Sequence, residues 1–220
     1  MVFCPPSPPI PSTTLSFSQE VACSTDLQLH APHWPEANKP HGKRLSHANR
    51  EGGLCEDILV DKVVLVNHAG NAAWGNFSEL KPVDFERSWR ICAFGSFLCC
   101  QQAVPDMVSS GNGTILFTGA TSAVRGRAGA LAFSSAKFAV RGLAWSLARE
   151  VGPKGIHVAH IIIDGILDTS TVRSDMSPDA EEPLLNTDAV ADVYWSLVEQ
   201  HKSTWTFELD LRPHNEDFFS

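Results

Sequence analysis

The feature that most constrains this chain is an alternation of short apolar runs with helical patterns, which begins at Asp57. Three runs have the length and the β-branched composition of strands: Ile58–Val66, Gly113–Thr118 and His157–Ile163. The last run is apolar almost throughout, which is typical of a parallel strand covered on both faces. The alternation therefore predicts an α/β fold built on a parallel sheet.

Three helices and a last strand complete the expected order. Pro82–Met107 is apolar on two sides, so we expect it to be buried in a core or against a second subunit. Phe133–Val151 carries apolar residues on one face and ends at a Gly-Pro pair. A third helix begins near Asn186–Asp188, which are good N-cap residues, and Trp205–Leu211 alternates like a strand with one buried face.

The first 56 residues have a different composition. Five prolines fall within the first eleven positions, and no period of 2 or 3.6 is visible. Such a segment is expected to be irregular. We therefore divide the chain into an irregular segment, 1–56, and an α/β domain, 57–220.

Charge and cysteine content exclude several classes of protein. The net charge is -8, with no basic stripe, which argues against nucleic acid as a partner. No stretch approaches about 20 apolar residues, so no membrane partner is expected. The six cysteines form no C-x-x-C pair, so we expect no metal site and no disulfide framework, but reduced thiols in a cytoplasmic protein.

Three motifs follow these elements in order: Asn67-His68-Ala69-Gly70, Phe133-Ser-Ser-Ala-Lys137, and Asp164-Gly165 followed four residues later by Thr169. Together they resemble the short-chain dehydrogenase/reductase family. The resemblance implies a Rossmann-like, mostly parallel, doubly wound sheet and an oxidoreductase that uses NAD or NADP. It also implies a small-molecule carbonyl or alcohol as substrate, and a dimer or other homo-oligomer.

The resemblance assigns roles to single residues. In the family, N-N-A-G lies beside the adenosine, Y-x-x-x-K begins the helix that flanks the active site, and the Thr of P-G-x-x-x-T lies near the nicotinamide carboxamide. By that likeness the cofactor-binding residues are Asn67, Ala69, Gly70, Lys137, Gly165 and Thr169.

The chain departs from the family at three catalytic positions. Phe133 stands at the position of the Tyr, Ala120 at that of the Ser and Cys92 at that of the Asn, so Lys137 alone remains of the four. The Tyr hydroxyl is the proton donor in usual members, and its loss should lower the rate by a factor of the order of 10² to 10⁴.

Two nearby hydroxyls are candidates to replace the missing ones. Thr121 and Ser122 follow the vacated Ser position and could hold a substrate oxygen, so they join Lys137 as catalytic candidates. The single tyrosine of the chain, Tyr194, lies on a different expected helix and is not assumed to be a substitute.

The family's glycine-rich turn, T-G-x-x-x-G-x-G, is also missing. Only Gly42, Gly52 and Gly53 precede Gly70, and no placement of them fits. The sheet is therefore expected to be incomplete at its N-terminal half, which leaves the strand Ile58–Val66 as an apolar edge. A misassembled reading frame, an alternative splice form and an unrelated fold of residues 1–56 over that edge are all compatible with the sequence.

Two functional hypotheses follow. The first is an NAD(P)-dependent oxidoreductase of slow turnover, in which Lys137 orients the nicotinamide ribose. The second is a catalytically inactive pseudoenzyme that binds or dimerises through the helices Pro82–Met107 and Phe133–Val151. The lineage favours the first hypothesis and the residues present favour the second. The sequence leaves the substrate, the choice between NAD and NADP, and the oligomeric state open.

Overall fold

The structure is a computed structural model that describes residues 63–175 and 183–215. Its main sheet has the strand order β1-β2-β3-β6, and all three pairings are parallel. The strands are β1 (Val64–Asn67), β2 (Gly113–Thr118), β3 (Ile156–Ile163) and β6 (Glu208–Leu211). The predicted Rossmann-like α/β fold with a parallel sheet is therefore confirmed.

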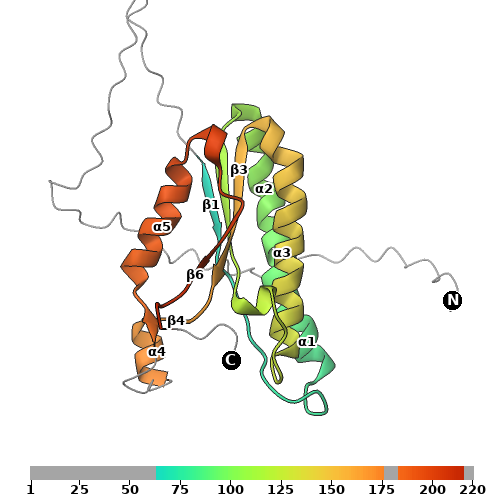
Figure 1. Cartoon of the computed structure of the whole chain (residues 1–220). Helices are drawn as coiled ribbons and strands as arrows, with labels where there is room; N and C mark the ends of the chain where they lie inside the picture. The colour runs from blue at the N-terminus through green and yellow to red at the C-terminus, as the bar shows by residue number, and fades with distance from the viewer. Residues whose placement is uncertain (1–62, 176–182, 216–220) are drawn as a thin grey trace, which may run out of the picture. The chain divides into compact units, whose positions relative to one another are not determined.

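Helices cover both faces of this sheet (Figure 1). One face carries α1 (Pro82–Trp89), the π-helical turn η2 (Arg90–Phe94), α2 (Gly95–Ser110) and α3 (Leu131–Val151). The opposite face carries α5 (Thr187–Glu199), which begins within the predicted Asn186–Asp188 and has Asn186 as its N-cap. The Asn186 side chain accepts a hydrogen bond from the amide of Ala189 at 2.8 Å. The sheet is thus doubly wound.

Two apolar cores lie on the two faces of the sheet because successive side chains of a strand point to opposite sides. Ile115, Phe117 and Val158 pack with residues of α2 and α3. Leu116, Ala159 and Ile161 pack with residues of α5. The central strands β2 and β3 are buried along their whole length, which explains their continuous apolar sequence.

Several element boundaries differ from the predicted ones. The predicted strand Ile58–Val66 is observed as Val64–Asn67, and residues 58–62 lie outside the described part of the chain. The helix predicted to end at Met107 continues to Ser110, where Gly111 adopts a left-handed conformation that ends it. The loop after β2 contains a 3-10 turn, η3 (Thr121–Ala123).

The C-terminal part was predicted less well. A short helix α4 (Ser170–Asp175) and a two-stranded sheet of β4 (Ile166–Leu167) and β5 (Leu184–Leu185) were not expected. The last strand begins at Glu208, not at Trp205. The predicted single buried face is wrong for Phe207, whose ring contacts Trp145 of α3 while Leu209 packs in the core beside α5.

The helical run Pro82–Ser110 carries more apolar surface than the sequence analysis allowed. By length and by a mean hydropathy of 1.2 over 18 residues it meets the criteria for a membrane-crossing helix. This criterion uses length and composition alone, so the expected absence of a membrane partner stays a prediction. The run contacts α3 and β1, and several of its large side chains remain exposed: Val83, Phe85, Trp89, Phe94, Phe97 and Leu98.

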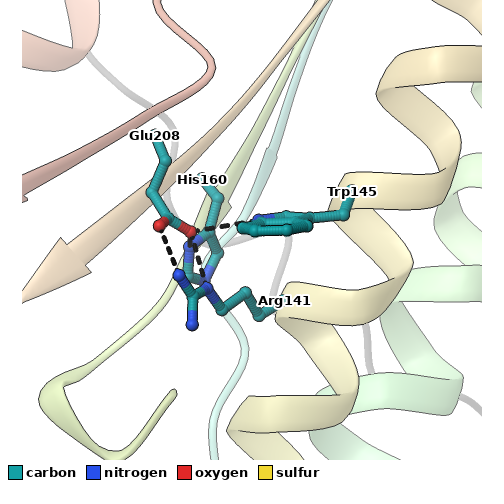
Figure 2. A network of polar contacts seen from close by, with 4 residues as sticks. All are labelled: Arg141, Trp145, His160 and Glu208. Carbon is teal, nitrogen blue, oxygen red and sulfur yellow. Dashed lines mark hydrogen bonds and ion pairs between the residues drawn. The ribbon is translucent and has the colours of Figure 1, made fainter. Parts of the chain in front are cut away.

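A polar network fixes β6 to α3 and β3 (Figure 2). The carboxylate of Glu208 accepts two hydrogen bonds from Arg141 at 2.7 and 2.8 Å, and one from the indole of Trp145 at 3.2 Å. Its Oε2 also lies 2.9 Å from Nδ1 of the fully buried His160. Burial favours a raised pKa for Glu208, but the hydrogen bonds from Arg141, Trp145 and His160 outweigh burial and lower this pKa.

His160 also explains a glycine at the end of β2. A Cβ atom on Gly119 would lie 2.3 Å from Nε2 of His160, which no real side chain tolerates. The amide of Gly119 donates to the carbonyl of Ile161 at 2.6 Å. At the end of β2 the backbone of Gly119 therefore packs directly against the imidazole of His160. The residues that follow Gly119 lie at the carboxyl end of β3.

Candidate active site

The candidate site lies where the parallel strands end. The carboxyl ends of β1, β2 and β3 bring together the segments that follow Asn67, Thr118 and Ile163. Ligands of open α/β sheets bind at this edge, because the loops after the strands converge there.

Lys137 is the central cation of this edge. Its side chain is 4% exposed, and its Nζ donates a hydrogen bond of 2.8 Å to the carbonyl of Thr118 at the end of β2. A Cβ atom on Gly70 would lie 3.8 Å from the same Nζ. Burial lowers the pKa of Lys137. The geometry therefore places an ammonium group with unused hydrogen-bonding capacity between the loops that follow β1 and β2.

Phe133 lies one helical turn before Lys137 on α3. Its ring centroid is 5.6 Å from the Lys137 Nζ and 5.6 Å from the ring of Trp74. Phe133 is half-buried, so its ring forms part of an accessible wall beside the ammonium. The Trp74 loop is joined to the loop before α3 by a hydrogen bond of 2.9 Å from the amide of Gly75 to the carbonyl of Gly129.

Cys92 and Ala120 occupy the other two altered positions. Cys92 is fully buried in the π-helical turn η2, and its Sγ accepts a hydrogen bond of 3.5 Å from the amide of Asn71. This contact fixes the chain just after Gly70 to the helix. Ala120 is half-buried in extended backbone immediately before η3, and it offers a methyl group where a hydroxyl would be needed.

Thr121 and Asp164 form a hydrogen-bonded pair across the ends of β2 and β3. The hydroxyl of the half-buried Thr121 donates to Oδ1 of Asp164, whose side chain is 3% exposed. The other carboxylate oxygen, Oδ2, lies 3.4 Å from Nη1 of Arg212. Ser122, the second predicted hydroxyl, follows in the same turn and is half-buried. The acidic residue of the site is therefore Asp164, which the sequence analysis named only as the first residue of the third motif.

A chain of three polar side chains crosses the opposite face of the same edge. Nδ1 of His68 lies 3.0 Å from the Thr118 hydroxyl, which lies 2.8 Å from the hydroxyl of Tyr194 on α5. Burial and the nearby Lys137 charge lower the pKa of His68, while burial raises the pKa of Tyr194. Tyr194 is on a different helix from Lys137, as predicted, and its hydroxyl contacts Thr118.

The predicted cofactor-binding residues are distributed over two loops. The side-chain Nδ2 of Asn67 is turned inward and donates to Cys100 Sγ at 3.7 Å, whereas Ala69 and Gly70 are exposed at the strand end. Gly165 has φ +143, a conformation that side chains rarely adopt. The Thr169 hydroxyl accepts a hydrogen bond of 3.2 Å from the amide of Val172 and so caps α4. The loops after β1 and β3 thus open onto the same edge as Lys137.

The family is settled by comparison with known proteins. The sequence profile of the short chain dehydrogenase family matches residues 59–180, more than half of the chain. The chain belongs to the short-chain dehydrogenase family. No curated protein sequence matches it significantly.

Solved structures agree with this assignment. A short-chain dehydrogenase from Rhodopseudomonas palustris is 36% identical with a TM-score of 0.57, over 69% of this chain and 62% of that one. A Tyr-to-Phe variant of ElxO with NADPH bound is 25% identical with a TM-score of 0.60, over 67% and 64%.

An alcohol dehydrogenase from the archaeon Thermococcus sibiricus, complexed with 5-hydroxy-NADP, is similar in fold, with 21% identity and a TM-score of 0.62. The alignment covers 70% of this chain and 64% of that one. The chain therefore spans less than two thirds of the length of these short-chain dehydrogenase structures.

Proposed function

We propose that the protein is an NAD(P)-dependent oxidoreductase of low turnover that acts on a small alcohol or carbonyl compound. The observation that carries this proposal is the buried ammonium of Lys137 at the carboxyl ends of β1 and β2. Burying an isolated charge is costly, so a lysine at such a position indicates a ligand that uses it. A ribose with two hydroxyl groups would accept the hydrogen-bond donors that Lys137 has left.

We assign the described residues to parts of a nicotinamide dinucleotide by their family likeness. Lys137 and the loop from Gly165 to Thr169 would hold the nicotinamide and its ribose, and the exposed Ala69 and Gly70 would lie beside the adenosine. The described residues include no glycine-rich strand-turn-helix for the pyrophosphate. The bound nicotinamide would supply or accept the hydride, and the residues of this chain would hold the ribose and the reacting oxygen. Whether NAD or NADP is used is left to experiment.

Phe133 is compatible with cofactor binding in this proposal. The Tyr-to-Phe variant of ElxO holds NADPH, so a short-chain dehydrogenase that lacks a tyrosine hydroxyl can still bind the reduced cofactor. In this chain the Phe133 ring leaves the Lys137 Nζ free of any phenol partner. Slow turnover follows, because a phenyl ring cannot transfer a proton to the substrate oxygen.

Titration with NADPH and NADH tests the proposal. We expect quenching of tryptophan fluorescence in the full chain, because Trp74 lies against Phe133 at the site. Lys137→Met should weaken binding at least tenfold, since it removes charged hydrogen-bond donors. Lys154→Met is the matched control, because Lys154 is exposed beyond the other end of α3. Absence of binding at millimolar cofactor would contradict the proposal.

A second candidate function is a dimerising module without catalysis. Exposed apolar side chains on α1, η2, α2 and α3 favour it, among them Trp89, Phe94, Phe97 and Phe138. A patch of this kind marks a protein contact. Sedimentation at several concentrations should show a homo-dimer, and Phe97→Glu should give a monomer. Cys92 and Cys100 form no disulfide among the described residues, and a reducing, cytoplasmic setting is proposed for either function.

A further inference from the structure

Asp164 sets the polarity of the hydrogen bond that the site offers to a substrate. The Thr121 hydroxyl donates its single proton to Oδ1 of Asp164. The Arg212 guanidinium lies 3.4 Å from the other carboxylate oxygen, Oδ2. The Thr121 oxygen is left with acceptor lone pairs only.

This polarity is opposite to the one that a carbonyl substrate requires. A ketone oxygen only accepts hydrogen bonds, whereas an alcohol hydroxyl also donates one. Thr121 is the residue directly after Ala120, the vacated serine position, and it is half-buried while Asp164 is 3% exposed. A ligand that reaches the Thr121 oxygen must therefore bring its own donor.

We infer that the pair Thr121 and Asp164 makes this site selective for a small alcohol over the ketone of the same shape. The inference rests on the proposed function, and it assigns Asp164 as a specificity-determining residue that acts through Thr121. The hydrogen bond from an alcohol to the Thr121 oxygen has no counterpart for the ketone. The expected preference is about fivefold in affinity, the effect of one net hydrogen bond of about 1 kcal/mol.

The test uses 1-phenylethanol and acetophenone, which differ by two hydrogen atoms. Their dissociation constants for the full chain are measured by saturation-transfer NMR without cofactor. Asp164→Asn should abolish or reverse the preference, because an amide can donate to the Thr121 oxygen and so release the threonine proton toward the ligand. Thr121→Val should abolish it as well, by removing the acceptor.

Two further variants serve as controls. Asp210→Asn alters the other carboxylate on Arg212, whose Nη2 lies 2.5 Å from Asp210, and should leave the preference unchanged. Thr121→Ser keeps the hydroxyl and should retain the preference, which separates recognition from a general loss of folding. Circular dichroism monitors the folding of each variant.

The outcomes separate the inference from the proposed function. Equal or tighter binding of the ketone to the wild type, or an unchanged preference in a folded Asp164→Asn or Thr121→Val variant, overturns the inference. Binding of NADPH without measurable binding of 1-phenylethanol also overturns it and leaves the oxidoreductase proposal standing. Absence of NADPH binding contradicts the proposed function, whatever the two small molecules show.

Discussion

The two halves of the candidate site have diverged to different extents. The lysine half, made of Lys137, Gly70 and Thr118, keeps two family motif residues, Gly70 after β1 and Lys137 on α3, whose Nζ donates to the carbonyl of Thr118 at the end of β2. The aspartate half, made of Thr121, Asp164 and Arg212 at the ends of β2, β3 and β6, has Asp where the family motif has Pro. The lysine half thus keeps motif residues where the aspartate half has a substitution, and the roles of the two halves toward cofactor and substrate stay proposals.

Restoring the missing hydroxyl groups should give the largest effect. The double variant Phe133→Tyr with Ala120→Ser supplies a phenol beside Lys137 and a hydroxyl at the vacated position, so turnover of acetophenone with NADPH should rise about 100-fold. Phe138→Tyr is the matched control, because Phe138 is exposed on the same helix. A rate equal to that of the wild type would show that the two halves no longer cooperate.

Removing the Asp164 carboxylate from the aspartate half should cause the largest loss of stability. Asp164→Ala leaves the hydroxyl of Thr121 without its acceptor and Arg212 without its buried partner, so we expect a loss of about 2 kcal/mol in the free energy of unfolding. Asp210→Ala removes an exposed partner of Arg212 and should cost under about 0.5 kcal/mol. Urea titrations measure both, and equal losses would contradict the assigned burial of Asp164.

Removing the charge of Lys137 should stabilise the protein, whereas removing Asp164 should destabilise it. Burial lowers the pKa of Lys137 in the folded protein, so at pH 7 the charged side chain opposes folding. Lys137→Met should therefore raise the free energy of unfolding by about 1 kcal/mol. The gap should narrow as the pH rises toward 10.5, where the unfolded lysine also loses its proton. A destabilised Lys137→Met variant would contradict this account.

The smallest expected effect is on the pH dependence of stability, and it comes from substituting His160, which lies outside both halves. Burial lowers the pKa of His160, and the hydrogen bond and charge of Glu208 offset burial only in part, while Arg141 and Lys137 act in the same direction as burial. Below pH 6.5 the unfolded chain therefore takes up a proton that the folded chain resists, and stability falls. Unfolding titrations from pH 7.5 to 5.5 should show a shallower fall for His160→Gln than for the wild type, with the exposed His214→Gln as control.

Local patterns were enough to predict the central elements. The β-branched runs of β2 and β3 and the apolar period of α3 can each be recognised within one short segment of sequence, and the structure confirms these elements. The position of Lys137 followed from its helix and the motif order. Its placement at the strand ends agrees with that expectation, whereas its role in the cofactor site stays a proposal.

The missed features depend on contacts between distant residues. The partners Thr121 and Asp164 are 43 positions apart, and Arg141 and Glu208 are 67 apart, so no local period reports them. Glu208 appeared only as a polar residue in an alternating strand. One local signal for Asp164 was present in the sequence. A polar residue stands there directly after a buried strand, at the position where the family motif has a proline.

The network around Glu208 has a consequence for synthesis of the protein on the ribosome. Arg141 and His160 are translated well before Glu208, and β6 has its only described sheet pairing with β3. In a nascent chain the imidazole of His160 therefore has no hydrogen bond to Glu208 until β6 has been synthesised. Until then the edge of β3 that pairs with β6 stays unpaired. The described four-stranded sheet is therefore completed only after Glu208 and the rest of β6 have left the exit tunnel.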